Sequence, residues 1–521
     1  MSSLPIYNRP FSRQAAPDDE STNPDVTAAA QTLPIARFEA PALAAPGKLS
    51  GQPLRHAMTV VTVAWVFGSV WMHGLAGAPL THFAAALGAN NFEFGLLAAI
   101  PFVAALTALP ASILIDRSGE RKKIFLISLY IGRLMWVPIA LVPWGIVHVY
   151  GFGQAKLAIA AFLLLILAMN VANAVANPAW VSWMADTVPS RMRGRYFARR
   201  RQWGICSAIP AALIGGWALD HFAGSNVAGE VLLMCATLFM IATVFGTADA
   251  AMFHLVPHTP KPRPREPLLK TFAQPLKNKR FAFFCCCSAI LWFAIAGQGQ
   301  FVNKFLIERL GVGSVAVQMI VLVGPLLATL FVLPIWGRVI DRYGKRPAMM
   351  IAIGGLVPVG IGWCFLRGDS ANAVAACAAL AALGAVCWTG VEVTNFNLTL
   401  EFSGTDRTGR GKHGAAGGGS AYIAVHTVIV NTAGCLGGLF YGAIAESLAT
   451  WHATVPILGH MSFYEVLFTI SAVLRLLAIA PLALVVEPNA KPTVYALRYV
   501  CGSLYNNVLG AVSFPMRIAR R

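Results

Sequence analysis

The chain has 521 residues, of which 57% are hydrophobic and only 12% are charged, and this composition excludes the water-soluble globular classes. Apolar stretches recur along it, and those of about 20 residues can cross roughly 30 Å of hydrocarbon as helices. The formal net charge of +18 lies mostly in the loops between them. It therefore indicates topology and attraction to anionic lipid heads, and no basic patch carries a nucleic-acid recognition motif.

Residues 1–56 are rich in Pro, Ala, Asp and Ser and lack hydrophobic periodicity. They predict a disordered cytoplasmic tail and not a cleaved signal. Residues 57–256 hold six apolar runs, which predict an N-terminal six-helix bundle. The expected helices cover 57–80, 94–115, 123–144, 157–180, 203–220 and 229–254. The stretch 257–280, rich in Pro, Lys and Arg, predicts a cytoplasmic linker.

Residues 281–486 hold six more apolar runs and predict a C-terminal six-helix bundle. The expected helices cover 281–306, 315–337, 347–366, 372–400, 421–445 and 462–486. Residues 487–521 predict a cytoplasmic tail, either amphipathic on the membrane surface or solvated. Basic residues follow the even-numbered runs, so the positive-inside rule places both termini in the cytoplasm. We expect a multi-pass protein of a plasma or inner membrane.

Motifs for covalent chemistry are missing from the sequence. The segment SGTDRTGRGKHG at 403–414 has two glycines at phosphate-loop spacing, but Arg410 stands where the lysine is needed. The cysteines in the apolar runs lack CxxC spacing, which favours small membrane residues over a metal or redox site. We therefore expect no enzyme activity, no cofactor and no metal.

A charged turn occurs twice, 225 residues apart in the chain. Its residues are Asp116, Arg117 and Gly119 in the first copy, and Gly337, Asp341, Arg342, Gly344 and Arg346 in the second. The second copy resembles the G-x-x-x-D-R-x-G-[RK]-[RK] signature of the major facilitator superfamily. The resemblance implies an all-α membrane protein of two six-helix bundles related by an internal repeat. In the first copy Ser112 replaces the first glycine and Glu120 a basic residue.

The resemblance also implies that the aspartate and arginine of each turn belong to an inner gate that holds the bundles together. The alternative is that these charges only mark a cytoplasmic turn. We expect the turn cations to pair with Asp186 in the first half and with Glu401 or Asp406 in the second. We also expect the glycines to permit close backbone approach and the aspartate to accept from helix N-terminal amides.

Polar side chains at helical spacing predict substrate contacts. The fourth run carries Asn170, Asn173 and Asn177, and the tenth carries Trp388, Glu392 and Asn395. Because polar groups are costly in lipid, these faces should look into the bundle or a wet cavity. The resemblance implies that the first and seventh runs line the same cavity, which adds Trp71, His73, Gln298, Gln300 and Asn303. The alternatives are interhelical hydrogen bonding for the amides and interfacial anchoring for the tryptophans.

Glu392 is the carboxylate nearest the middle of a run, so we expect it to carry protons for coupling. The alternative is a permanent ion pair with Lys304 or another buried cation, and His73 is a second candidate carrier. Arg133 and Arg475 lie deep in the third and twelfth runs. Buried cations need partners, but the sequence does not identify them.

These features predict a secondary active transporter that moves a small solute by alternating access and is coupled to protons. Two alternatives keep the same fold: a lipid-translocating protein and a non-transporting sensor. The expected partners are the solute, protons and membrane lipids, with a monomer as the default state.

Overall fold

The computed structural model describes residues 51–189, 192–222, 227–257, 275–296, 298–368, 372–404, 418–456, 459–487 and 490–503. All of them belong to one unit, Gly47–Arg521. Twelve helices within the described residues are long and apolar enough to cross a membrane. The expected all-α, twelve-span architecture is therefore confirmed. Most of the expected linker, residues 258–274, lies outside the described residues.

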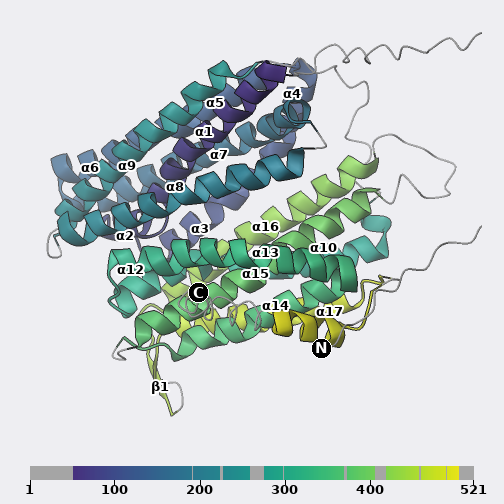
Figure 1. Cartoon of the computed structure of the whole chain (residues 1–521). Coiled ribbons are helices and arrows are strands. Elements are labelled where there is room, and N and C mark those ends of the chain that lie inside the picture. Colours follow the sequence, from purple (N-terminus) through teal and green to yellow (C-terminus); the bar gives the residue numbers. More distant parts are fainter. Residues whose placement is uncertain are drawn as a thin grey trace, which may run out of the picture. The chain divides into compact units, whose positions relative to one another are not determined.

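The first half contributes spans 1–6, drawn from purple to teal in Figure 1. These spans are α1 (Gly51–Leu75), α3 (Asn91–Ala105) with α4 (Ala108–Ser118), α5 (Arg121–Leu134) with α6 (Trp136–Tyr150), α7 (Ala155–Thr187), α8 (Arg193–Phe222) and α9 (Ala228–Met252). A short helix, α2 (Ala78–Ala86), connects spans 1 and 2, and 3-10 turns η1 (Phe152–Gln154) and η2 (Phe253–Leu255) flank α7 and α9. The first helix begins six residues before the expected start at 57, because its polar first turns continue the helix beyond the apolar run.

The second half contributes spans 7–12, drawn from green to yellow. These spans are α10 (Lys279–Ala296) with α11 (Gln298–Lys304) and η5 (Phe305–Arg309), α12 (Ser314–Gln318) with η6 (Met319–Val323) and α13 (Gly324–Tyr343), α14 (Lys345–Gly362) with η7 (Trp363–Phe365), α15 (Ala373–Gly404), α16 (Gly418–Ser447) and α17 (Phe463–Ala483). A 3-10 turn, η4 (Pro275–Lys277), precedes α10. Strands β1 (Ala453–Val455) and β2 (Gly459–Met461) pair antiparallel between α16 and α17.

Buried apolar side chains of the described residues form three clusters, and one of these contains side chains from both halves. One buried cluster combines side chains of both, including Phe83 and Phe94 from the first half and Phe301 and Phe305 from the second. Two further clusters each belong to one half, around Trp183 and around Trp336 respectively. The halves therefore share a core over only part of their length.

The shared part lies at the helix ends remote from the charged turns. Asn91, the first residue of α3, accepts from Lys304 Nζ at 2.5 Å and donates its backbone N–H to Glu446 Oε2 at 2.9 Å. A Cβ added at Gly95 would lie 2.4 Å from the Cα of Gly442, so α3 and α16 touch through their backbones. We call this the closed end, and we call the end with the charged turns at 118–121 and 343–346 the motif end.

Candidate functional site

A cavity of about 670 Å³ opens within the first half, and we call it the first-half cavity. Four of the expected residues line it, namely Trp71, Asn170, Asn173 and Asn177. Asn170 donates its amide N–H to Ile166 O at 2.8 Å, and Asn173 donates to Met169 Sδ at 2.9 Å. Both amides donate one N–H one turn back along α7, which leaves each a second N–H. A Cβ added at Gly132 would lie 2.7 Å from Asn173 Oδ1, so that oxygen packs against α5.

A buried ion pair borders the same cavity. Arg133 Nη2 on α5 lies 2.8 Å from Asp249 Oδ2 on α9, and both side chains are buried. The Arg133 guanidinium also stacks 3.6 Å from the centre of the Trp71 ring. The partner of Arg133, which the sequence does not identify, is therefore Asp249.

Two glycines make room for this pair. A Cβ at Gly68 would lie 2.9 Å from Asp249 Oδ2, and one at Gly246 would lie 2.6 Å from Trp71 Cδ1. The sequence does contain a signal here, because Asp249 is itself a carboxylate inside an apolar run.

A second guanidinium faces the first-half cavity. Arg200 on α8 lies 4.4 Å from the centre of the Trp65 ring and 4.9 Å from that of Trp180. Its Nε has a long hydrogen bond of 3.5 Å to Val61 O. Within the described part of the chain, no carboxylate forms an ion pair with it. Arg200 is not among the site residues expected from the sequence, because it belongs to a basic run that is typical of a cytoplasmic loop.

A smaller cavity of about 210 Å³ lies in the second half and is lined by Gln298, Trp388 and Arg475 among others. Arg475 is 3% exposed and donates Nη1–H to Leu356 O at 2.9 Å, while its Nε has no partner within the described residues. The partner of Arg475, which the sequence does not identify, is therefore the backbone carbonyl of Leu356. Gln298 Oε1 accepts from Ser471 Oγ at 3.4 Å, which ties α11 to α17.

Glu392 lies on the exposed face of α15 and accepts from Trp388 Nε1 at 2.9 Å. Arg201 on α8, in the other half, is close enough to act on its carboxylate electrostatically. Lys304 is bound instead to Asn91 and lies 3.7 Å from Glu308. The alternative of an ion pair between Glu392 and Lys304 is therefore wrong for this conformation.

The remaining polar candidates stay outside both cavities. His73 is half-buried and donates Nδ1–H to Ser69 O at 3.0 Å. Asn395 accepts from Ser288 Oγ at 3.1 Å, a contact between α15 and α10 that suits interhelical bonding. Gln300 and Asn303 hold their side-chain oxygens buried, without a hydrogen-bond partner in the described structure.

The charged turns form the expected ion pairs with carboxylates on neighbouring helices. Arg121, which is buried, pairs with Asp186 at 2.6 Å, and Lys345 pairs with Glu401. Each pair joins two helices of the same half. Arg117 is exposed and makes no ion pair in the described part of the chain. The side chain of Asp116 and all of Asp406 lie outside the described residues.

The second turn differs from expectation in two respects. Glu487, and not Asp341, accepts the backbone N–H groups at the start of α14, from Lys345 at 3.1 Å and Arg346 at 2.8 Å. A Cβ at Gly337 would meet no atom within 4 Å, so this glycine serves no close approach here. Gly344 does need its freedom, because its φ is 105°.

The C-terminal segment lies against this turn. A helix over residues 493–503 buries Ala496 and Val500 in the core of the second half. Arg342 stacks 5.9 Å from the centre of the Tyr499 ring. Val494 and Leu497 remain exposed, so this part of the tail is amphipathic and docked.

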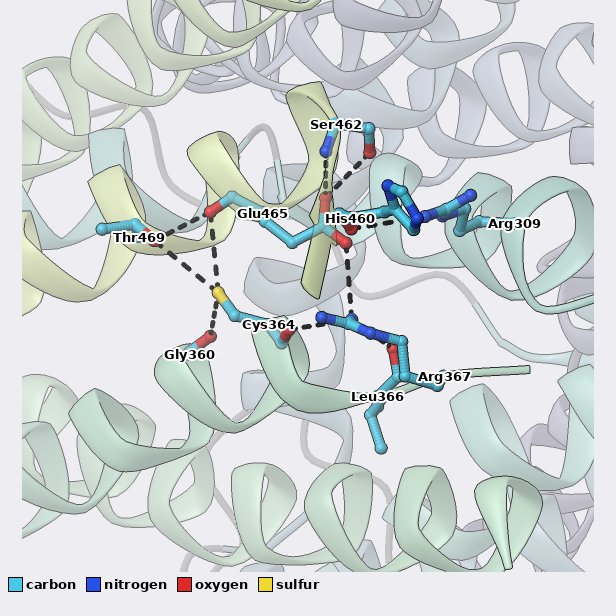
Figure 2. A network of polar contacts seen from close by, with 9 residues as sticks. All are labelled: Arg309, Gly360, Cys364, Leu366, Arg367, His460, Ser462, Glu465 and Thr469. Atoms are coloured by element: carbon cyan, nitrogen blue, oxygen red, sulfur yellow. Dashed lines mark hydrogen bonds and ion pairs between the residues drawn. The ribbon is translucent and has the colours of Figure 1, made fainter. Parts of the chain in front are cut away.

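Figure 2 shows the surroundings of the buried carboxylate Glu465 at the start of α17. Its Oε2 accepts from both the backbone N–H and the Oγ of Ser462, each at 2.8 Å, and its Oε1 lies 3.8 Å from Arg367. This is a helix-capping role that also ties the loop before α15 to α17. The Glu465 carboxylate therefore has a structural role at the start of α17.

Comparisons with known proteins agree with this architecture. Residues 60–413 match the model of the Major Facilitator Superfamily. The fold is similar to that of the nucleoside transporter NupG, with 15% identity and a TM-score of 0.56 over 83% of this chain and 98% of that chain. It is also similar to a D-xylose-proton symporter, with 14% identity and a TM-score of 0.60 over 84% and 98%.

A third similar structure is a bacterial homolog to the human lysosomal transporter Spinster, inward-facing and unoccupied. It shares 17% identity and a TM-score of 0.53 over 87% of this chain and 97% of that chain. Identities this low show the fold alone, and no curated protein matches the chain. With two thirds of its length matching the family model and twelve spans in two related halves, the chain belongs to the major facilitator superfamily.

Proposed function

We propose that the protein is a secondary active transporter that moves a small solute by alternating access. The observation that carries this proposal is the unequal contact between the halves. They share a core and hydrogen bonds at the closed end, whereas around Trp183 and Trp336 each half has its own core. Two bundles joined at one end can rock about a site between them.

The basic residues of the turns indicate which end of the protein faces the cytoplasm. With the motif end in the cytoplasm, as the positive-inside rule favours, the structure is open to the inside. The similar bacterial homolog of Spinster, itself inward-facing, supports this assignment. Both termini then lie in the cytoplasm of a plasma or inner membrane, and the bundles correspond to residues 57–256 and 281–486.

The charged turns form the gate that opposes the closed end. In this conformation Asp341 and Arg342 are exposed and Gly337 faces open space, so the residues are available for contacts made when the motif end closes. The first turn contributes Asp116, Arg117 and Gly119 to the same proposed gate.

Glu392 is the proton carrier in this proposal. Asp249 is held by Arg133 and Glu465 by its capping role, whereas Glu392 has only the Trp388 N–H and the distant charge of Arg201. It therefore lies in the second half within electrostatic reach of the first half, and it forms no ion pair among the described residues. The similarity to a D-xylose-proton symporter supports coupling of this kind, and His73 remains the second candidate.

The test is solute flux in proteoliposomes, measured under a pH difference and also as exchange without one. Glu392→Gln should retain exchange and lose uphill accumulation, because a neutral amide cannot carry the proton. Glu230→Gln, at an exposed carboxylate in the first turn of α9, is the control and should accumulate normally. If the Glu392 variant still accumulates solute, the assignment fails. Lipid scrambling or ligand binding without flux in the same vesicles would select one of the two alternative functions.

A further inference from the structure

We infer that the first-half cavity binds an anionic solute with a flat aromatic body, an aromatic carboxylate that also carries a hydroxyl or amino group. The inference rests on the proposed function, because it names the solute class of that transporter. It is drawn from three features of the first-half cavity: its net charge, its aromatic walls and its amides.

The charge of the cavity is not balanced. Its lining includes two guanidiniums, Arg133 and Arg200, and one carboxylate, Asp249, which leaves +1. Asp249 is already engaged by Arg133, through both Nε at 3.3 Å and Nη2 at 2.8 Å. Arg200 is within electrostatic reach of Asp249 but has no ion-pair partner of its own among the described residues.

An unpaired guanidinium is tolerated while the cavity is open to water, but not once it is occluded. Desolvation of an isolated charge is costly, and a partner of opposite sign removes most of that cost. A carboxylate suits the role because the planar guanidinium can bind it through two parallel hydrogen bonds. The solute itself then supplies the missing charge when the bundles close around it.

The walls select a flat body. Four tryptophans line the cavity, Trp65, Trp71, Trp136 and Trp180. Trp71 lies against Trp136 in a T-shaped arrangement with ring centres 6.5 Å apart. Aromatic surfaces favour a planar ligand through stacked or edge-to-face contacts. The cavity volume of about 670 Å³ lies within the range of small-molecule sites.

The amides can pair with a polar substituent on the solute. Asn170 and Asn173 each use one of their two side-chain N–H groups on α7, and the carbonyl oxygen of Asn170 remains as an acceptor. Asn177 lines the same wall two turns from Asn170. A hydroxyl or amino substituent on the ring would donate to the Asn170 oxygen while the carboxylate lies at Arg200. A neutral sugar would satisfy the amides but leave Arg200 unpaired.

The experiment measures binding directly, by thermal shift and calorimetry on the purified full chain. The probes are the hydroxybenzoates and aminobenzoates, their uncharged benzamide analogues, the cationic benzylamine analogues and the non-aromatic 4-hydroxycyclohexanecarboxylate. We expect at least one benzoate to bind ten-fold or more tightly than its amide, amine and cyclohexane analogues. If no benzoate binds, or if the neutral or cationic analogues bind equally well, the inference is overturned.

Variants of Arg200 test whether the carboxylate of the solute binds at this residue. Arg200→Gln should weaken benzoate binding ten-fold or more, and Arg200→Lys should lose less because it keeps the charge but not the planar fork. Arg199→Gln, at the exposed neighbouring residue, should bind as the unaltered chain does. Unchanged binding by a folded Arg200→Gln overturns the inference. Arg200→Lys serves in its place if the Gln variant does not fold, and equal binding by it and the unaltered chain would then overturn the inference.

The two proposals can fail separately. Benzoate binding without flux in proteoliposomes would refute transport and leave the solute class standing. Flux of neutral solutes that is indifferent to Arg200→Gln would refute the solute class and leave transport standing.

Discussion

The carboxylate of Asp220, at the end of α8, accepts the backbone N–H of Ser314, at the start of α12, at 2.6 Å. The next amide, that of Val315, donates to the same carboxylate at 2.9 Å. A carboxylate from one half therefore caps the first turn of a helix in the other. Because the amides at a helix start lack intrahelical partners and carry a partial positive charge, this contact favours the closed end.

Asp220→Asn should loosen the closed end. A partly exposed carboxylate at a helix start contributes about 1 kcal/mol, so its loss should shift a two-state equilibrium about five-fold. We expect the population with a separated closed end to rise by that factor. Double electron–electron resonance between spin labels at Gln154 and Thr450, which are both exposed near this end, measures the distance directly.

Glu230→Gln provides the control for this experiment, because it removes an exposed carboxylate at the same end of the first half. Its distance distribution should match that of the unaltered chain. Equal distributions for the Asp220 variant and the control would contradict the proposed role.

His82 should make the closed end sensitive to pH. Its Nε2 lies 3.2 Å from Ser314 Oγ, and burial lowers its pKa from the ordinary value of 6.5, while the Asp220 carboxylate opposes that shift. A lowered histidine pKa means that the closed end favours the neutral ring. The contact is therefore stable above the ordinary pKa and is lost as the pH falls through the lowered one.

The same spin-label pair should thus report opening of the closed end on acidification below pH 6.5. His82→Gln, which cannot charge, should show a flatter pH response. An unchanged pH profile in the glutamine variant would assign the response to another group.

The twelve spans and the charged turns could be predicted because both are local features of the chain. Length and hydropathy define a span, and a repeated pattern of charge and glycine defines a turn. The pairing of remote residues could not be predicted in this way. Glu487 caps the start of α14 from 142 positions along the chain, and Arg133 and Asp249 are 116 positions apart.

For the candidate site, too, the features that could be predicted are those that depend on local spacing along a helix. Asn170, Asn173 and Asn177 share one face of α7 because their spacing matches the helical period, and all three line the first-half cavity. Trp71 and His73 are two positions apart, which places them about 200° apart around a helix. Only Trp71 lines the cavity, and that outcome follows from helix geometry.

Asp249→Asn should destabilise the protein strongly. It leaves Arg133 buried without a counter-charge, and breaking a buried pair in this way costs about 3–5 kcal/mol. We expect a clear fall in the thermal unfolding temperature in detergent. The double variant Arg133→Met with Asp249→Leu removes both charges and should recover much of the loss. Equal instability of the single and double variants would show that the pair matters through packing alone.

Asp341→Asn should lower flux without affecting membrane insertion or thermal stability. Asp341 is exposed in this conformation, so its removal costs the open state nothing. In the proposed gate its contacts form only when the motif end closes. Flux in proteoliposomes at matched protein density is the measurement, and undiminished flux would contradict the gating role.

Gly344→Ala and Gly337→Ala should separate the structural glycine of the second turn from the gating one. Gly344 has a φ of 105°, and a Cβ there would lie 3.1 Å from Ala490 Cβ, so alanine should destabilise the fold by about 1–3 kcal/mol. Gly337 lies within α13 and a Cβ there meets nothing within 4 Å, so alanine should leave the thermal stability equal or slightly higher.

Flux then tests whether closure covers Gly337. If closing the motif end packs another helix over it, Gly337→Ala adds a methyl group to that contact and should reduce flux several-fold in spite of its normal stability. The matched comparison is Ala328→Gly, on the same helix, which removes a methyl group and should show lower stability with flux near normal. Full flux in Gly337→Ala would mean that the glycine is dispensable in both conformations, and that the gate does not close over this face of α13.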